Sequence, residues 1–162
     1  MVLVTLVFCR RHDISFYDIA DRAVIPIAIT LGFGRIANFI NAEMYGTSYS
    51  GPFCVDYSAN PYMRSPPRGC RHPVQLYEML KNWMLTVVLW MMLRRWQPRP
   101  GVVFWSFIGL YGVIRFFLMY LRVEERVWSG LTQSQIFSAV MALAGAGMVI
   151  WLLSRRTTAW HE

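Results

Sequence analysis

The chain has 162 residues, of which 56% are apolar and only 15% are charged, and its mean hydropathy is +0.35. This composition is more apolar than that of an ordinary soluble domain and excludes most classes of water-soluble enzyme. The net charge is +7, and every basic residue except Lys81 is an arginine. The basic residues flank apolar blocks and form no continuous stripe, which argues against nucleic acid as a partner and favours the phosphate of membrane lipids.

The apolar residues are gathered into five blocks, at residues 2–9, 16–40, 73–93, 101–121 and 132–153. The first block is too short to cross a bilayer, and we interpret it as the second half of a helix that begins outside this sequence. The other four are continuously apolar for about 20 residues, which is typical of membrane-spanning helices. The sequence therefore predicts an all-α fold: a polytopic integral membrane bundle with four full spans and one partial N-terminal span.

Residues 1–162 are predicted to form a single membrane domain, in which residues 41–72 make a long, proline-rich loop or cap. Cys54 and Cys70 both lie in this loop, where a disulfide and two free thiols are equally open alternatives. The loop is predicted to be periplasmic because arginine is denser in the connections at the other end of the blocks, which the positive-inside rule makes cytoplasmic. These connections are residues 10–13, 94–100 and 155–162.

Two arginines lie inside the predicted spans, where a charged side chain is costly and is kept mainly for function. Arg35 and Arg115 each come shortly before the periplasmic end of their block, so we expect them at a similar depth. Asn38 and Tyr111 lie on the same helix faces as these arginines. The block that begins after His72 adds the N–H groups of a helix amino terminus. These groups together predict a site for a phosphate among lipid head groups.

The same residues are also compatible with purely structural roles. Arg35 and Arg115 are each able to extend to the membrane interface, or to pair with Glu43 and Glu78 in salt bridges. His72 is equally compatible with a helix-capping or interfacial role.

Four segments, in chain order, carry recognisable motifs. They are residues 34–46 (GRIANFINAEMYG), 72–78 (HPVQLYE), 111–115 (YGVIR) and 134–136 (SQI). Together they resemble the motifs of the phosphatidylglycerol–prolipoprotein diacylglyceryl transferase family, and the resemblance runs from about residue 10 to residue 155.

The resemblance implies a multi-pass transferase of the bacterial inner membrane with its active face toward the periplasm. Such an enzyme moves the diacylglyceryl group of phosphatidylglycerol to the lipobox cysteine of a prolipoprotein signal peptide and forms a thioether. It implies that Arg35, Asn38 and Arg115 bind phosphatidylglycerol. Catalytic or supporting roles fall on the other motif positions, which are Glu43, Gly46, His72, Gln75, Tyr77, Glu78 and Tyr111. No cofactor is implied, and the scattered His and Cys residues predict no metal site.

The sequence departs from the family pattern in two places. It lacks the family's His-Gly-Gly-Leu segment, whose histidine is the candidate for thiol activation, and it has Met119 where an acidic residue is usual. We therefore expect the chain to be the C-terminal part of a longer seven-span protein and to be inactive or nearly so by itself, with His72 as the next base to test. The alternative is a noncatalytic phospholipid-binding or assembly protein, a shortened remnant of the family.

Overall fold

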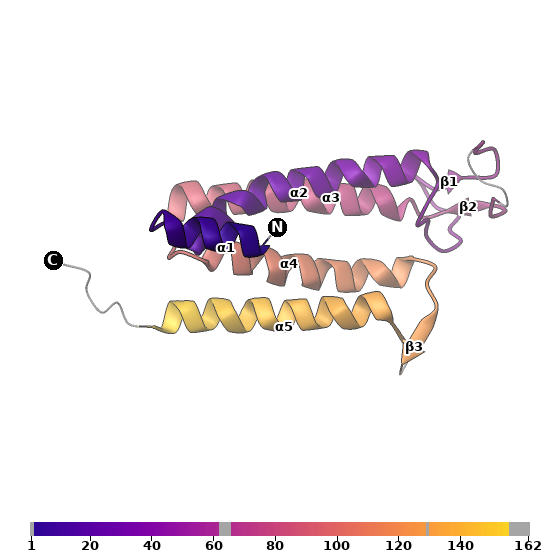
Figure 1. Ribbon diagram of the computed structural model, residues 1–162. Coiled ribbons are helices and arrows are strands. Elements are labelled where there is room, and N and C mark those ends of the chain that lie inside the picture. Colours follow the sequence, from indigo (N-terminus) through magenta and orange to yellow (C-terminus); the bar gives the residue numbers. More distant parts are fainter. Residues whose placement is uncertain (1, 62–65, 129, 156–162) are drawn as a thin grey trace.

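The computed structural model describes residues 2–61, 66–128 and 130–155. It is mostly helical, and its four longest helices run side by side (Figure 1). The helices are α1 (Val2–Arg11), α2 (Phe16–Ile40), α3 (Val74–Met91), α4 (Val102–Leu118) and α5 (Gln133–Ser154), with a π-helical turn, Met92–Trp96, after α3 and a 3-10 turn, Met119–Leu121, after α4. These bounds agree within a few residues with the five predicted blocks, so the prediction that each block is helical is confirmed.

Two small antiparallel sheets modify the all-α prediction. In the loop before α3, β1 (Val55–Asp56) pairs with β2 (Cys70–Arg71), and between α4 and α5, β3 (Arg126–Trp128) pairs with β4 (Leu131–Thr132). Cys54, which precedes β1, and Cys70, the first residue of β2, form a disulfide bond with a Cα–Cα distance of 5.4 Å. This bond decides between the two alternatives that the sequence left open.

Three helices are long and apolar enough to cross a membrane: α2, α4 with its 3-10 extension, and α5. The sequence predicted four such spans, and α3 is the helix that does not reach this criterion within the described residues. Four polar residues lower the hydropathy of α3, yet all of them are buried in the bundle: Gln75, Glu78, Lys81 and Asn82.

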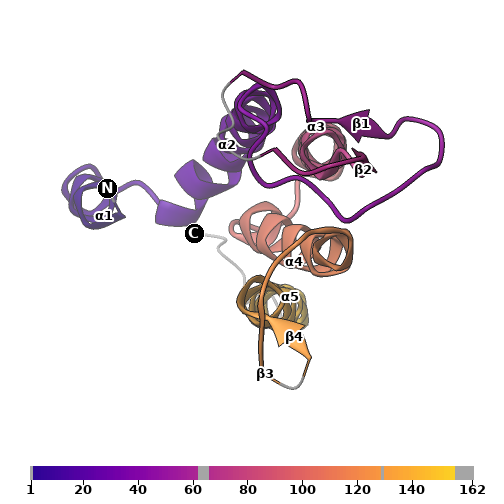
Figure 2. The ribbon, with the colours of Figure 1, turned by 90° about the vertical axis from the view of Figure 1, so that its right-hand side faces the viewer.

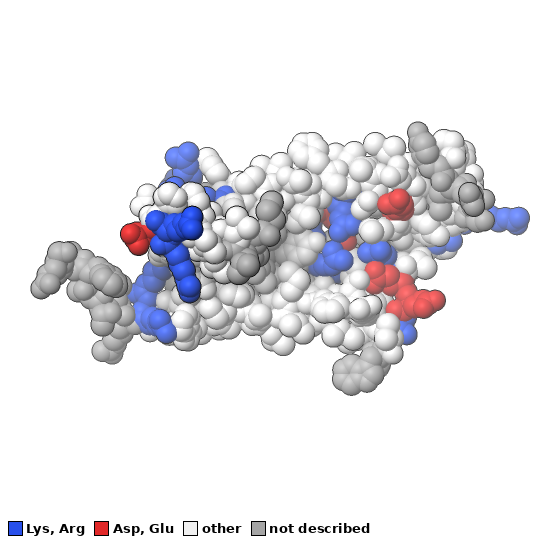
Figure 3. All heavy atoms as spheres, in the orientation of Figure 1, with Lys and Arg blue, Asp and Glu red and all other residues white. Residues whose placement is uncertain are grey.

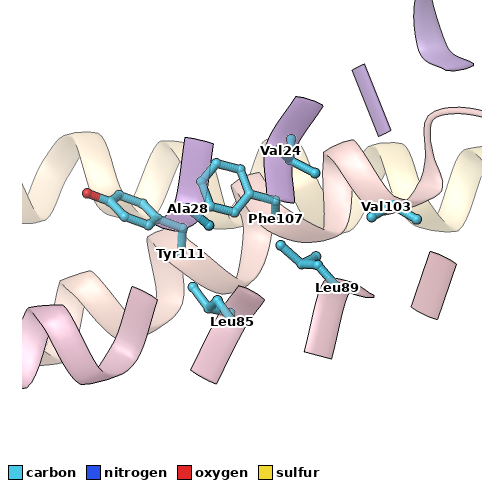
Figure 4. Packing of buried hydrophobic residues seen from close by; sticks show 7 residues of the cluster. All are labelled: Val24, Ala28, Leu85, Leu89, Val103, Phe107 and Tyr111. Carbon is cyan, nitrogen blue, oxygen red and sulfur yellow. The ribbon is translucent and has the colours of Figure 1, made fainter. Parts of the chain in front are cut away.

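A cluster of buried apolar side chains joins α2, α3 and α4 (Figure 4). Its members are Val24, Ala28, Leu85, Leu89, Val103, Phe107 and Tyr111. Its α3 members, Leu85 and Leu89, follow the polar residues along that helix. The packed cluster fixes the three helices against one another and so keeps their polar residues aligned.

Helix α4 also begins against α2, through Asp21. The two carboxylate oxygens of Asp21 accept hydrogen bonds from the backbone N–H groups of Gly101 and Phe104, both at 2.7 Å. These are unpaired donors at the first turn of α4, so Asp21 caps a helix that lies far away in the sequence. Gly101 adopts a left-handed φ of +91°, which a residue with a Cβ rarely tolerates.

The two ends of the bundle differ in character. Both sheets lie at one end, which we call the loop end, and Figure 2 looks directly onto it. The starts of α2 and α4 and the ends of α1, α3 and α5 lie at the opposite end (Figure 1). Connections 10–13 and 94–100, together with Arg155, therefore lie at one end of the molecule, while the rest of connection 155–162 lies outside the described residues.

Candidate functional site

Arg35 lies near the C-terminal end of α2, close to the loop end, and forms an ion pair with α3. Its Nε lies 2.5 Å from Oε2 of Glu78, and the two side chains are 14% and 2% exposed. Nη1 of Arg35 also donates to the sulfur of Met44 at 3.3 Å. The salt-bridge interpretation of Arg35 is therefore observed, with Glu78 as its partner.

Asn38 continues this network by one helical turn. We assign its side-chain amide from its partners, with the oxygen accepting from Nη1 of Arg35 at 3.2 Å and the nitrogen donating to Oε2 of Glu43 at 3.3 Å. Glu43 is exposed, so this contact extends the network from the buried pair toward the surface. Three predicted site residues of the first motif thus lie in one chain of polar contacts that ends on Glu78.

Gln75 connects the loop to the start of α3. Its side-chain N–H donates to the backbone carbonyl of Glu43 at 2.6 Å, and its oxygen accepts from the hydroxyl of Tyr57 at 3.2 Å. Burial raises the pKa of Tyr57, which keeps the hydroxyl protonated and able to donate. Gln75 is therefore a positioning group that holds the first motif against the second.

His72, Tyr77 and Gly46 form a second group on the loop side of α3. The ring of His72 is stacked on Tyr49 with centroids 3.9 Å apart, and its Nδ1 lies 3.4 Å from the hydroxyl of Tyr77. Its backbone carbonyl accepts from Gly46, at 3.0 Å, and its backbone N–H donates to Thr47, at 3.1 Å. The helix itself begins at Val74, with Pro73 at the N-cap, one residue after the start of the predicted block 73–93.

Gly46 fits where a side chain does not. A Cβ at this position would lie 2.6 Å from Cβ of His72 and 2.7 Å from the carbonyl oxygens of His72 and Leu121. We expect Gly46→Ala to lower the free energy of unfolding by about 1–3 kcal/mol, because two backbones would have to move apart.

The loss is measured by unfolding in mixed micelles. Gly34→Ala is the control, because a Cβ at Gly34 meets no atom within 4 Å. Equal stability of the two variants would contradict the close-packing role of Gly46.

Arg115 and Tyr111 lie one turn apart on α4. Nη1 of Arg115 donates to the hydroxyl of Tyr111 at 2.9 Å, and no carboxylate of the described residues pairs with Arg115. The face of the Tyr111 ring is covered by Nζ of Lys81, which lies 3.8 Å from its centroid. Lys81 in turn interacts electrostatically with Glu78, Arg115 and Arg35. The two predicted arginines are thus on the same side of the molecule, around one buried lysine.

A groove of about 600 Å³ runs along α2 and ends at Arg35 and Asn38. Its other described walls are apolar or small, and they are Ala23, Pro26, Ile27, Thr30, Leu31 and Gly34. Figure 3 shows basic side chains at the end opposite the loop end and a mixed group of basic and acidic side chains toward the loop end, with little charge on the surface drawn between them. The arrangement suits a molecule with an anionic head and an apolar tail.

Sequence reasoning counted two charges inside the spans and missed two more. Glu78 was assigned a motif position and an open role as a salt-bridge partner, but not a place inside a span, and Lys81 was assigned no role, although both are buried in α3. One signal was present in the sequence: Lys81 is the single lysine of an arginine-rich chain, and it follows Glu78 by three residues, which places both on one helix face.

Comparison with known proteins gives a consistent result. The family model for prolipoprotein diacylglyceryl transferase matches residues 1–151. Curated proteins named phosphatidylglycerol–prolipoprotein diacylglyceryl transferase are similar to the chain: that of Pseudomonas putida is 36% identical over 166 residues, that of Azotobacter vinelandii 33% over 168, and that of Ectopseudomonas mendocina 34% over 163.

These alignments cover 98%, 99% and 96% of this chain, in that order, and 60%, 61% and 59% of the relatives. The chain therefore spans about 60% of the length of the curated relatives it matches. Since the family model matches nearly the whole sequence, the chain belongs to the prolipoprotein diacylglyceryl transferase family.

Proposed function

We propose that this chain acts in the transfer of the diacylglyceryl group from phosphatidylglycerol to the lipobox cysteine of prolipoproteins. The observation that carries the proposal is a group of charged side chains near the loop end. Arg35 of α2 pairs with the buried Glu78 of α3, and Arg115 of α4 donates to Tyr111, whose ring face is covered by Lys81. Family membership and the names of the relatives support the reaction class.

The chain lies in the bacterial inner membrane with four spans, α3 included, and with its loop end as a periplasmic cap. The outward face of α3 supports this arrangement, because its large apolar side chains Leu80, Met84 and Val87 are 51%, 70% and 55% exposed. The polar residues of α3 point into the bundle, so they are compatible with a span. The disulfide between Cys54 and Cys70 supports the periplasmic side, because such bonds persist in oxidising compartments.

Phosphatidylglycerol binds with its acyl chains along the groove on α2 and its phosphate at Arg35, Asn38 and Arg115. Guanidinium groups suit a phosphate diester because they donate several hydrogen bonds in one plane. The groove leads directly to Arg35 and Asn38. Arg115 has a hydroxyl partner but no carboxylate partner among the described residues, which leaves its charge available to an anion.

The same cations assist the reaction. The thiol sulfur attacks the glyceryl carbon that carries the phosphate, the carbon–oxygen bond breaks, and glycerol phosphate leaves with the bonding electrons. The thiol proton passes to a base, because the thiolate is the effective nucleophile. Arg35 and Arg115 stabilise the negative charge that collects on the departing phosphate.

The remaining motif residues hold the reacting groups and the loop in place. Gln75 and Glu43 hold the loop against α3, and Gly46 lets the loop pass close to His72. Tyr111 orients Arg115 through its hydroxyl. His72 and Tyr77 lie on the loop side, where a peptide approaching from the periplasm would meet them first.

The proposal predicts that Arg35→Ala weakens binding of phosphatidylglycerol by at least about tenfold, as truncating a charged partner commonly does. Binding is measured in nanodiscs by displacement of a fluorescent phosphatidylglycerol, with phosphatidylcholine as the zwitterionic comparison. Arg115→Ala is expected to give a similar loss. Transfer is expected to be slight in this chain by itself, so binding is the primary readout, and any mass gain of the cysteine in a lipobox peptide should be lost in Arg35→Ala.

Arg22→Ala is the matched control. Arg22 lies on the same helix as Arg35 but is exposed near the opposite end of the bundle. We expect this variant to bind like the unaltered chain. Equal binding of the two lipids by the unaltered chain, or transfer that persists in Arg35→Ala, would refute the assignment.

A further inference from the structure

Lys81 is a buried polar residue that neither the motifs nor the proposed reaction uses. Its side chain is 5% exposed, and its Nζ has no hydrogen-bond acceptor among the described residues. Its one close polar contact there is the ring face of Tyr111. A buried ammonium with three free N–H groups is costly and calls for a physical reason.

The charged groups around Lys81 come from every helix packed against it. Glu78 lies one turn before it on α3 and pairs with Arg35 of α2. Arg115 of α4 donates to Tyr111, the residue whose ring face Lys81 covers. This set holds three cations and one carboxylate. That carboxylate is already paired with Arg35 and lies beyond ion-pair distance of Lys81.

The pairing of Arg35 creates a conflict with the proposed function. Arg35 cannot direct its charge to a lipid phosphate while its Nε remains 2.5 Å from Glu78. If Arg35 left, Glu78 would be an uncompensated carboxylate at 2% exposure, and a buried charge without a partner is strongly unfavourable.

We propose that Lys81 is the substitute partner of Glu78: it takes the carboxylate when Arg35 leaves to bind an anionic phosphate. This inference rests on the proposed function of Arg35. In the resting state Arg35 pairs with Glu78, and in the lipid-bound state Lys81 pairs with Glu78. The exchange keeps the buried carboxylate neutralised in both states.

The chemistry of Lys81 suits this exchange. Residues three apart on a helix are neighbours, and the flexible stem of lysine lets its ammonium cross the remaining distance. No hydrogen bond has to be broken at Nζ, because none is made to a described residue. Oε1 of Glu78 makes no hydrogen bond to a described residue, and Oε2 has only its ion pair with Arg35, so the carboxylate is able to accept from the ammonium once Arg35 leaves.

The inference is tested by a double-mutant cycle on phosphatidylglycerol binding in nanodiscs. Lys81→Met should weaken binding by about tenfold, because releasing Arg35 then leaves Glu78 unpaired. Glu78→Gln should bind at least as tightly as the unaltered chain, because Arg35 is free from the start. The double variant Lys81→Met/Glu78→Gln should bind like Glu78→Gln.

Two results of the cycle would overturn the exchange. One is Lys81→Met binding like the unaltered chain, and the other is a double variant as weak as Lys81→Met, which would mean that Lys81 contacts the phosphate directly. Failure of the proposed function looks different, because the unaltered chain would then show no preference for phosphatidylglycerol over phosphatidylcholine.

A second measurement needs no variant that removes Lys81. As the single lysine, Lys81 gives one side-chain signal in a chain labelled with ¹⁵N-lysine. Phosphatidylglycerol should shift this signal in the unaltered chain and leave it nearly unchanged in Glu78→Gln. An equal shift in both would contradict pairing with Glu78.

Discussion

Replacing Asp21 with asparagine is expected to lower the free energy of unfolding by about 2–4 kcal/mol, because hydrogen bonds to a buried charged group are among the strongest in a protein. Asp21 is 4% exposed, and its two oxygens accept from Gly101 and Phe104. The asparagine amide has the same shape, but its NH₂ would face one of these N–H donors. One hydrogen bond would be lost, and the first turn of α4 would be left with an unpaired buried donor.

The measurement is reversible unfolding in mixed detergent micelles, followed by helical circular dichroism. Asp18→Asn is the matched control, because Asp18 lies one turn earlier on α2 and is exposed. We expect this control to change stability by less than about 0.5 kcal/mol, as surface substitutions usually do. A similar loss in both variants would mean that Asp21 acts through net charge and not as a cap.

The close contact of α4 and α5 gives the second large effect. A Cβ on Gly145 would clash with the backbone nitrogen of Gly109, and it would lie 2.5 Å from the Cα of Gly109 and 2.8 Å from the carbonyl oxygen of Trp105. All three are backbone atoms, so no side-chain rotation relieves the clash. We expect Gly145→Ala to lower the free energy of unfolding by about 1–3 kcal/mol, and Gly145→Val to lower it further.

Gly147→Ala tests the same chemistry without the clash. Gly147 lies on the same helix, and a Cβ there meets no atom within 4 Å. Alanine favours a helix over glycine by about 1 kcal/mol, so this control is expected to be neutral or stabilising. A Gly145→Ala variant as stable as Gly147→Ala would show that the two helices are not held at backbone contact.

Much of the site could be predicted from the sequence, but its pairing could not. The motifs identified Arg35, Asn38 and Arg115, and apolar blocks placed both arginines toward one end. The same reasoning left open whether Arg35 pairs with a carboxylate. Glu43 lies in the same motif as Arg35 and Glu78 lies in the next motif, and the sequence does not say which of them reaches the arginine. Only the packing of α3 against α2 brings Glu78 to Arg35 and leaves Glu43 exposed.

Local sequence was sufficient to predict the helices of this protein, because each helix is specified by a continuous apolar run. It was also sufficient to predict the family, because each motif is a contiguous stretch of sequence. The tertiary structure decided what depends on residues far apart. Asp21 caps a helix about 80 residues later, and the packing of α3 against α4 places Lys81 on the ring of Tyr111. Hydropathy averages the two faces of a helix, so it cannot distinguish a polar residue in lipid from one inside a bundle. That difference is set by which helices pack together.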